Sequence, residues 1–245
     1  MIRENDLTTP ALLQCRNLSK TFHLGLRKLE VLRHIDFQIY PGETVLLFGK
    51  CGHGKSVLLS LLCGLDQPTT GDINFDGTWF HSCTQNQLAY LRRTQIGIIF
   101  QNLNLLPKWT ALENVAAGLE DVVSSTKTRY SLAQNLLEEM GMGSRLDHLP
   151  IELSMGEQQR VAIARTLIRE PKLILADEPT GDLDAVTAGQ ILHIFHSYLK
   201  KTNSTLLVAT HGIYPDTKCD RILNLNHGSL SQLVYQNTEP LWKVV

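Results

Sequence analysis

The first fifty residues carry the hydrophobic pattern of β-strands. Residues Leu12–Asn17 form one candidate, and every second residue of 34–39 is apolar, which is typical of a strand with one buried face. After the Pro41-Gly42 turn, residues 45–48 are all apolar. A short run of this kind predicts a central strand that is buried on both faces.

The next segment predicts a helix, a hairpin and a further strand. The helix begins at about Lys55, buries its leucines and ends just before Gly64, whose position suits a left-handed helix terminator. Residues 73–75 followed by Asp76-Gly77 predict a hairpin, and 96–100 form another apolar strand.

Residues 103–155 differ in character from the segments on either side. Helical patterns occur at 112–119 and 132–140, and we see no strong strand between them. This segment therefore predicts a helical subdomain inserted into an α/β domain.

The last third alternates helices with strands. We expect a helix at 156–169, a strand at 173–176, a helix at 185–200 and a strand at 205–209. Such alternation is typical of crossover units and a mainly parallel sheet. We therefore predict a single α/β domain over 1–245, with a core of 1–102 and 156–245, an N-terminal antiparallel β-subdomain and a helical subdomain of 103–155.

Composition narrows the class of protein. The chain has 245 residues, with 23 Lys and Arg against 24 Asp and Glu, so it lacks the basic footprint of a general nucleic-acid binder. No apolar run approaches the roughly 18 residues of a membrane-spanning helix, and the polar start shows no secretory signal. Five scattered cysteines without CxxC spacing indicate a reducing compartment. We expect a soluble, cytosolic protein with no nucleic-acid partner.

A glycine-rich stretch joins the apolar strand 45–48 to the following helix. It fits the pattern G-x-x-x-x-G-K-[ST] and reads Gly49-Lys50-Cys51-Gly52-His53-Gly54-Lys55-Ser56. Its glycines let backbone N–H groups turn inward, and the helix start adds its positive end. We expect Lys55 to reach the β- and γ-phosphates of a nucleotide and Ser56 to bind Mg²⁺. A packing turn is the alternative, although the strand and helix context favours a phosphate loop.

Other polar residues follow predicted strands. Asp177 and Glu178 end the strand 173–176, where a parallel sheet opens onto its ligand crevice, so Asp177 suits a metal and Glu178 suits the attacking water. An acidic helix entry is the alternative. Gln101 and His211 also follow strands and would be ordinary structural residues if taken alone, but we expect these strand ends to open onto the same crevice.

A further segment completes a recognisable set. Leu153-Ser154-Met155-Gly156-Glu157-Gln158-Gln159-Arg160 resembles the signature sequence of ABC-transporter ATPases, and the other motifs fall in that family's order over about residues 12–230. Residues 175–181 and 104–107 resemble one branch, the lipoprotein-release and macrolide-exporter ATPases. That branch works with mechanotransmission-type membrane permeases.

The resemblance implies a head-to-tail homodimer with two ATP molecules at its interface. Ser154 and the Gly156 amide would contact the partner's γ-phosphate, Phe22 would stack on adenine, and Asp184 would link the two sites. The implied ATP-binding set is Phe22, Gly49, Lys50, Cys51, Gly52, His53, Gly54, Lys55, Ser56, Val57, Ser154, Gly156 and Glu157. The implied catalytic set is Glu178, His211, Gln101 and Lys55, and the implied Mg²⁺ set is Ser56, Gln101 and Asp177.

The resemblance also implies where the protein works. The segment after Gln101 would meet an integral membrane permease through Leu105, Leu106, Pro107 and Trp109. The chain would then lie peripherally on the cytoplasmic face of the inner membrane. We expect an ATPase that powers export or lipoprotein release. Two alternatives stay open: an ATPase that regulates a membrane partner without transport, and an ATP-binding scaffold with weak turnover.

Four residues depart from the family pattern. Val57 replaces a usual hydroxyl, Met155 replaces the first signature glycine, and Gly212 stands where an acidic residue is common. His53 occupies a position inside the phosphate loop that is usually small, and we expect its imidazole to face solvent. None of these changes removes a catalytic residue, so we expect ATP hydrolysis to survive.

Overall fold

The computed structural model describes residues 10–25, 27–181, 183–211 and 219–233. The chain divides into two compact units, Met1–Arg93 with Thr205–Val245 and Thr94–Ser204. The predicted helical segment 103–155 lies inside the second unit, and the subdomain boundaries stay a prediction.

An antiparallel sheet forms one part of the first unit, as predicted. Its strands in spatial order are β2 (Arg27–Ile39), β1 (Leu13–Leu24), β4 (Thr70–Phe75) and β5 (Thr78–Trp79). The predicted hairpin at Asp76-Gly77 is confirmed, with φ angles of 49° and 83° that suit the tight turn between β4 and β5.

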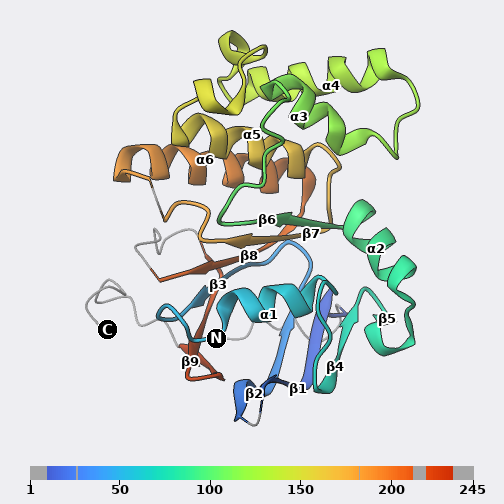
Figure 1. The fold of residues 1–245 in the computed structure, drawn as a ribbon, viewed down its shortest axis with the longest axis vertical. Coiled ribbons are helices and arrows are strands. Elements are labelled where there is room, and N and C mark those ends of the chain that lie inside the picture. The colour runs from blue at the N-terminus through green and yellow to red at the C-terminus, as the bar shows by residue number, and fades with distance from the viewer. Residues whose placement is uncertain (1–9, 26, 182, 212–218, 234–245) are drawn as a thin grey trace. The chain divides into compact units, whose positions relative to one another are not determined.

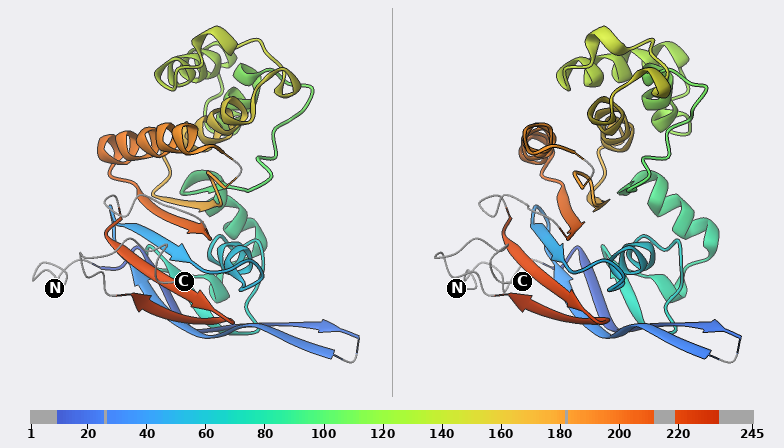
Figure 2. Two further views of the ribbon diagram at one scale, coloured as in Figure 1. Left: turned by 90° about the vertical axis from the view of Figure 1, so that its left-hand side faces the viewer. Right: turned by 60° about the vertical axis from the view of Figure 1, so that its left-hand side comes forward.

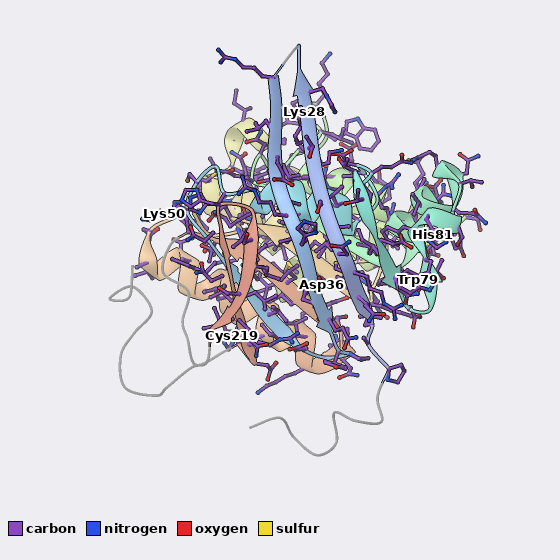
Figure 3. The ribbon with its side chains drawn as sticks, turned by 90° about the horizontal axis from the view of Figure 1, so that it is seen from below. Lys28, Asp36, Lys50, Trp79, His81 and Cys219 are labelled. Atoms are coloured by element: carbon purple, nitrogen blue, oxygen red, sulfur yellow. The ribbon has the colours of Figure 1, made fainter. Side chains whose placement is uncertain are left out.

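Strands β1 and β2 are much longer than the predicted strands. They pair from Leu13↔Ile39 to Leu24↔Arg27, with irregularities of register between Cys15 and Thr21. Their far end extends away from the other strands of this unit (Figure 2). Seen from below, Lys28 lies near that end of the strand pair and Asp36 lies toward the other (Figure 3).

The second sheet of this unit is mainly parallel. Its strands are β10 (Ser229–Leu233), β9 (Arg221–Asn226), β3 (Thr44–Phe48) and β8 (Thr205–Thr210), in that order. Strand β3 runs parallel to both β8 and β9, and β10 runs antiparallel to β9. Val45, Leu46 and Leu47 of β3 and the apolar residues of β8 are buried, and Phe48 is half-buried, so the predicted central strand is confirmed.

Two helices complete the first unit (Figure 1). They are α1 (Lys55–Leu62) and α2 (Gln85–Thr94), with a 3-10 turn, η2 (Phe80–Ser82), before α2. Helix α1 buries its leucines and is followed by Gly64 at φ 67°, as predicted. Sequence patterning missed α2, because only Leu88 and Leu91 of this polar helix are buried.

The second unit combines a parallel strand pair with helices. The strands are β6 (Ile96–Ile99) and β7 (Leu173–Asp177). The helices are α3 (Ala111–Ala116), α4 (Thr126–Glu139), α5 (Met155–Leu167) and α6 (Ala185–Thr202), with 3-10 turns η3 (Ala117–Leu119), η4 (Gly143–Arg145) and η5 (Pro150–Glu152). Both predicted helices of the segment 103–155 are present, although α4 begins six residues earlier than the predicted Leu132.

Side-chain caps set where these helices begin. Thr110 and Ser154 each accept a hydrogen bond from the amide three residues later, and Glu113 and Glu157 bond back to the amides of those caps. Asp184 caps α6 by accepting from two amides.

No helix in the described part of the chain is long and apolar enough to cross a membrane.

Asn114 holds the loop between β6 and α3. Its side chain is fully buried, accepts from the Leu106 amide at 2.8 Å, and donates to the carbonyls of Leu106, Trp109 and Thr110. One amide group therefore satisfies four backbone hydrogen bonds and fixes the path of residues 106–110.

We predict that Asn114→Ala lowers the free energy of unfolding by about 3 kcal/mol, because it removes the four hydrogen bonds that this buried side chain makes with the backbone of the loop. Urea denaturation followed by circular dichroism measures this loss. The matched control is Asn135→Ala on the exposed face of α4, expected to change stability by less than about 0.5 kcal/mol. Equal effects of the two changes would contradict the role given to Asn114.

Candidate functional site

The phosphate loop begins at a glycine that no other residue could replace without rearrangement. The Gly49 amide donates to the Thr210 carbonyl at 3.3 Å, which ties the loop to the end of β8. A Cβ atom at Gly49 would lie 2.5 Å from the Leu225 carbonyl oxygen on β9. The loop therefore leaves β3 in close backbone contact with both neighbouring strands.

The loop ends at Gly54, which stands at the N-cap position of α1. Its φ of 100° lies in the region that favours glycine, and a Cβ would be 3.0 Å from the side chains of Val31 and Leu32 on β2. Because Gly54 offers no capping side chain, the first amides of α1 lack the side-chain cap that α3, α5 and α6 have. These amides can serve an anion instead.

Lys55 is buried inside the loop. Its side chain is 6% exposed, and Nζ donates to the Gly49 carbonyl at 2.6 Å and to the Lys50 carbonyl at 3.4 Å. A buried ammonium needs such acceptors. The loop thus holds a positive charge among its own carbonyls, at the place where the sequence predicted contact with phosphates.

His53 differs from the prediction, which had its imidazole facing solvent. It is half-buried, with Nδ1 3.3 Å from the Leu225 carbonyl oxygen and its ring centre 4.6 Å from that of His227. Both partners belong to the β9–β10 hairpin, about 170 residues further along the chain, so local sequence could not reveal them. The large side chain is accommodated because it packs against this hairpin.

The other predicted phosphate-loop residues differ in exposure. Lys50, Cys51, Gly52 and Ser56 are exposed, and Val57 is half-buried on α1.

Phe22 lies on the β1–β2 pair, opposite Leu29. It is half-buried, and Lys20 Nζ lies 4.9 Å from the centre of its ring. Lys20 is itself held by Asp66 at 2.7 Å. A cation therefore already covers one face of this ring, and stacking of adenine on Phe22 stays a prediction.

His211 lies at the same sheet edge as the phosphate loop. It follows Thr210, which pairs with Phe48 in the parallel register of β8 and β3, and it is exposed. The first unit therefore brings His211 and the phosphate loop to neighbouring strand ends, as predicted from the pattern of strands. Gly212 lies outside the described residues.

In the second unit, the predicted acidic residues and Gln101 also follow neighbouring strands. Ile99 pairs with Ala176 in the parallel register of β6 and β7, so the two strands end at the same edge of the sheet. Asp177 is half-buried and Gln101 is exposed. The sequence prediction that these residues share one strand-end edge is confirmed within this unit.

Glu178 has an unusual backbone. Its φ is 49°, a left-handed conformation that costs a non-glycine residue energy, and its side chain is only 9% exposed. The Gly181 amide donates to the Glu178 carbonyl at 3.2 Å, so Glu178 is the first residue of a tight turn. The turn holds the carboxylate inward at the end of β7, in a position suited to orienting water or a proton.

The chain after Gln101 is held by an arginine that sequence reasoning did not single out. Leu103 and Asn104 have φ angles of 56° and 49°, and their carbonyls accept hydrogen bonds from the two terminal nitrogens of Arg165, each at 2.7 Å. Burial lowers the pKa of Arg165 from its ordinary value. Arg165 lies on α5, so the signature helix and the Gln101 segment share one charged contact.

The signature residues form the start of α5. The Ser154 hydroxyl accepts from the Glu157 amide at 3.3 Å, and Glu157 Oε2 accepts from the Ser154 amide at 2.8 Å. A Cβ at Gly156 would lie 2.7 Å from the Thr187 side chain of α6, so this position needs glycine. Met155 is 49% exposed and therefore lies away from the core of the unit.

Glu157 is also paired with a cation. Its Oε1 accepts from Arg145 Nε at 2.9 Å. The hydrogen bond from the Ser154 amide, followed by the one from Arg145, lowers the pKa of Glu157 to about 2. Glu157 therefore stays charged at physiological pH. No sequence signal marked Arg145, because this contact spans two separate segments.

Asp184 caps α6 with both of its carboxylate oxygens. Oδ1 accepts from the amides of Val186 and Thr187, and Oδ2 accepts from the Thr187 hydroxyl at 2.6 Å. The Thr187 hydroxyl is the main reason why the pKa of Asp184 is lowered. A link across a dimer interface through Asp184 stays a prediction.

Comparison with known proteins agrees with this set of features. The ABC transporter family model matches residues 32–181. The chain is 42% identical over 227 residues to the macrolide export ATP-binding/permease protein MacB of Rhodopirellula baltica. That match covers 92% of this chain and 33% of MacB. It is 41% identical over 219 residues to the lipoprotein-releasing system ATP-binding protein LolD of Legionella pneumophila (strain Paris). That match covers 89% of this chain and 96% of LolD.

Solved structures agree as well. The ATP-binding cassette MJ0796, determined as a dimer in a post-hydrolysis state bound to ADP and Pi, superposes with a TM-score of 0.84 at 33% identity. The match covers 91% of this chain and 100% of that one. The chain belongs to the ATP-binding cassette family and is an ABC ATPase subunit of a transporter.

Proposed function

We propose that this ABC ATPase works as a homodimer that binds two ATP molecules with Mg²⁺ and powers a mechanotransmission-type permease in export or lipoprotein release. The observation that carries the proposal is the buried Lys55 ammonium, held among carbonyls of the phosphate loop beside uncapped helix amides. A triphosphate would meet a fixed cation and a set of backbone donors there.

Each residue of the proposed catalytic set has a chemical task. Lys55 would leave its carbonyl acceptors for the β- and γ-phosphates. Glu178, whose carboxylate is held inward by a strained turn, would orient the attacking water and take its proton. His211 would hold the γ-phosphate, and Gln101 would orient the water from the neighbouring strand edge.

The proposed Mg²⁺ ligands are Ser56, Gln101 and Asp177. They offer hydroxyl, amide and carboxylate oxygens, which is the donor chemistry that Mg²⁺ prefers, and phosphate oxygens and water would complete its shell. The bound ion would neutralise charge on the β- and γ-phosphates. The chain's own part is to present these oxygens at strand ends.

A second copy would complete each nucleotide site. Ser154 and the Gly156 amide, at the start of α5, would contact the γ-phosphate held by the partner's phosphate loop. Dimeric assembly of the similar cassette MJ0796 supports this arrangement. ATP would then favour the closed dimer, and release of phosphate would favour the open one. Hydrolysis would thus act on the permease by changing the populations of the closed and open dimer.

The loop 103–110 is the proposed permease contact. Leu106 and Trp109 are 39% and 41% exposed, Pro107 is exposed, and Leu105 is half-buried. Asn114 fixes the backbone beneath them, so these apolar groups are presented in one arrangement. The names of the similar LolD and MacB proteins support a membrane partner for export or lipoprotein release, and hence a peripheral position at the inner membrane.

We predict that Glu178→Gln lowers kcat for ATP hydrolysis at least about 100-fold and traps an ATP-bound dimer, because the amide cannot accept the proton of water. Phosphate release and size-exclusion chromatography with ATP measure the two effects. Lys55→Met is the control, expected to bind ATP weakly and stay monomeric. Undiminished hydrolysis by Glu178→Gln would remove Glu178 from the catalytic set, and a wild-type chain that releases no phosphate would contradict turnover.

We predict that Trp109→Glu leaves hydrolysis by the isolated ATPase within about twofold of wild type while abolishing co-purification of its permease, because a charge at an apolar contact must be desolvated. Affinity purification from detergent-solubilised membranes, followed by mass spectrometry, identifies the permease. Val122→Glu is the matched control, since Val122 is an exposed apolar residue of the same unit. Retention of the permease by the Trp109 variant would place the contact elsewhere.

A further inference from the structure

The carboxylate of Glu157 is shared between the signature motif and a distant arginine. Oε2 accepts from the Ser154 amide at 2.8 Å, while Oε1 accepts from Arg145 Nε at 2.9 Å. Since Glu157 also donates its amide to the Ser154 hydroxyl, three contacts fix the first turn of α5. Any movement of the carboxylate would move the signature serine.

The charge of this carboxylate creates a conflict at an anion site. A carboxylate in the first turn stabilises a helix through the backbone dipole. An incoming γ-phosphate would use the same helix end and would be repelled by a negative charge within a few ångströms. A cation bonded to the carboxylate removes this conflict without removing the cap.

Backbone hydrogen bonds fix the position of Arg145. It closes the η4 turn, where its amide donates to the Met142 carbonyl at 2.9 Å and its carbonyl accepts from the His148 amide at 3.1 Å. The next residue, Leu146, accepts from the Leu112 amide at 3.0 Å, which ties the turn to α3. The guanidinium is therefore supplied by the part of the second unit between α4 and α5.

The Arg145 side chain does not serve the core. It is 44% exposed, and Glu157 is 27% exposed, so the pair lies at the surface where α5 begins. Ion pairs between exposed side chains contribute little to stability. Stability alone is therefore a weak account of this contact.

We propose that Arg145 is a positioning residue for nucleotide binding: it neutralises and orients Glu157, so that Ser154 and the helix end can accept the partner subunit's γ-phosphate. The proposal rests on the proposed function, in which Ser154 faces ATP held by a second copy. Arg145 acts through Glu157 and makes no contact with nucleotide.

A double-mutant cycle tests this idea in the hydrolysis-deficient Glu178→Gln background. We expect Arg145→Ala to raise the ATP concentration for half-maximal dimerisation about fivefold, in keeping with the size of charge effects at helix ends. Glu157→Gln keeps a cap acceptor and removes the charge. Made on top of Glu157→Gln, the same Arg145→Ala change should therefore shift the midpoint by less than about twofold.

Salt gives a second readout. Raising NaCl from about 0.05 M to about 0.5 M screens exposed charges, so the defect of Arg145→Ala should shrink at high salt. In the hydrolysing chain, Arg145→Ala should raise KM for ATP while changing kcat by less than about twofold. If Arg145 only stabilised the fold, neither the salt dependence nor the smaller defect in the Glu157→Gln background would be expected.

The outcomes separate this inference from the proposed function. If the Glu178→Gln parent forms no dimer with ATP, the proposed function fails. If the parent forms a dimer and Arg145→Ala has the same midpoint, or Glu157→Gln does not reduce the defect, the positioning role is wrong. Lys201→Ala, which removes an exposed ion pair with Glu139 on another surface, is the control and should match the parent. Thermal unfolding of every variant checks that each is folded.

Discussion

The site depends on a buried cation that is held by backbone oxygens of its own loop. Lys55 points back into its own loop, and the loop can enclose it because Gly49 and Gly54 permit backbone contacts that a side chain would block. The energetic cost of burying an ammonium is offset by the carbonyls that it binds. In the proposed function, phosphate oxygens of a nucleotide would replace these carbonyl oxygens around the Lys55 ammonium.

The helices differ in whether a side chain caps their first backbone amides. The cap side chains of α3, α5 and α6 each satisfy backbone amides, and in α5 the same cap is the signature serine. Helix α1 differs, since glycine leaves its first amides without a side-chain cap. The chain thus distinguishes helices closed by their own side chains from a helix whose first turn is open to a ligand.

Local patterns predicted much of this structure. The phosphate loop, the end of α1 near Gly64 and the Asp76-Gly77 hairpin depend on neighbouring residues, so the sequence was enough to locate them. The pattern failed for α2, whose helix is mostly polar, although Thr84 and Gln87 do bond reciprocally at its start as a capping pair. A closer reading of that pair would have located the helix.

The remaining features required long-range contacts. His53 packs against a hairpin about 170 residues away, which overturned its predicted exposure. Arg145 bonds to a carboxylate and Arg165 to backbone carbonyls of other segments, and the residue types alone give no sign of these contacts. The sequence identified residues expected to touch nucleotide, whereas the residues that hold them in place became visible only in three dimensions.

The backbone at Glu178 has an evolutionary consequence. Glycine would adopt its φ of 49° without strain, so the most comfortable residue for this turn is one that carries no carboxylate. Selection for an unstrained backbone alone would thus favour glycine at this position, whereas the proposed catalytic role would favour glutamate. Engineering that ranks variants by heat resistance would then discard a carboxylate that the proposed mechanism needs.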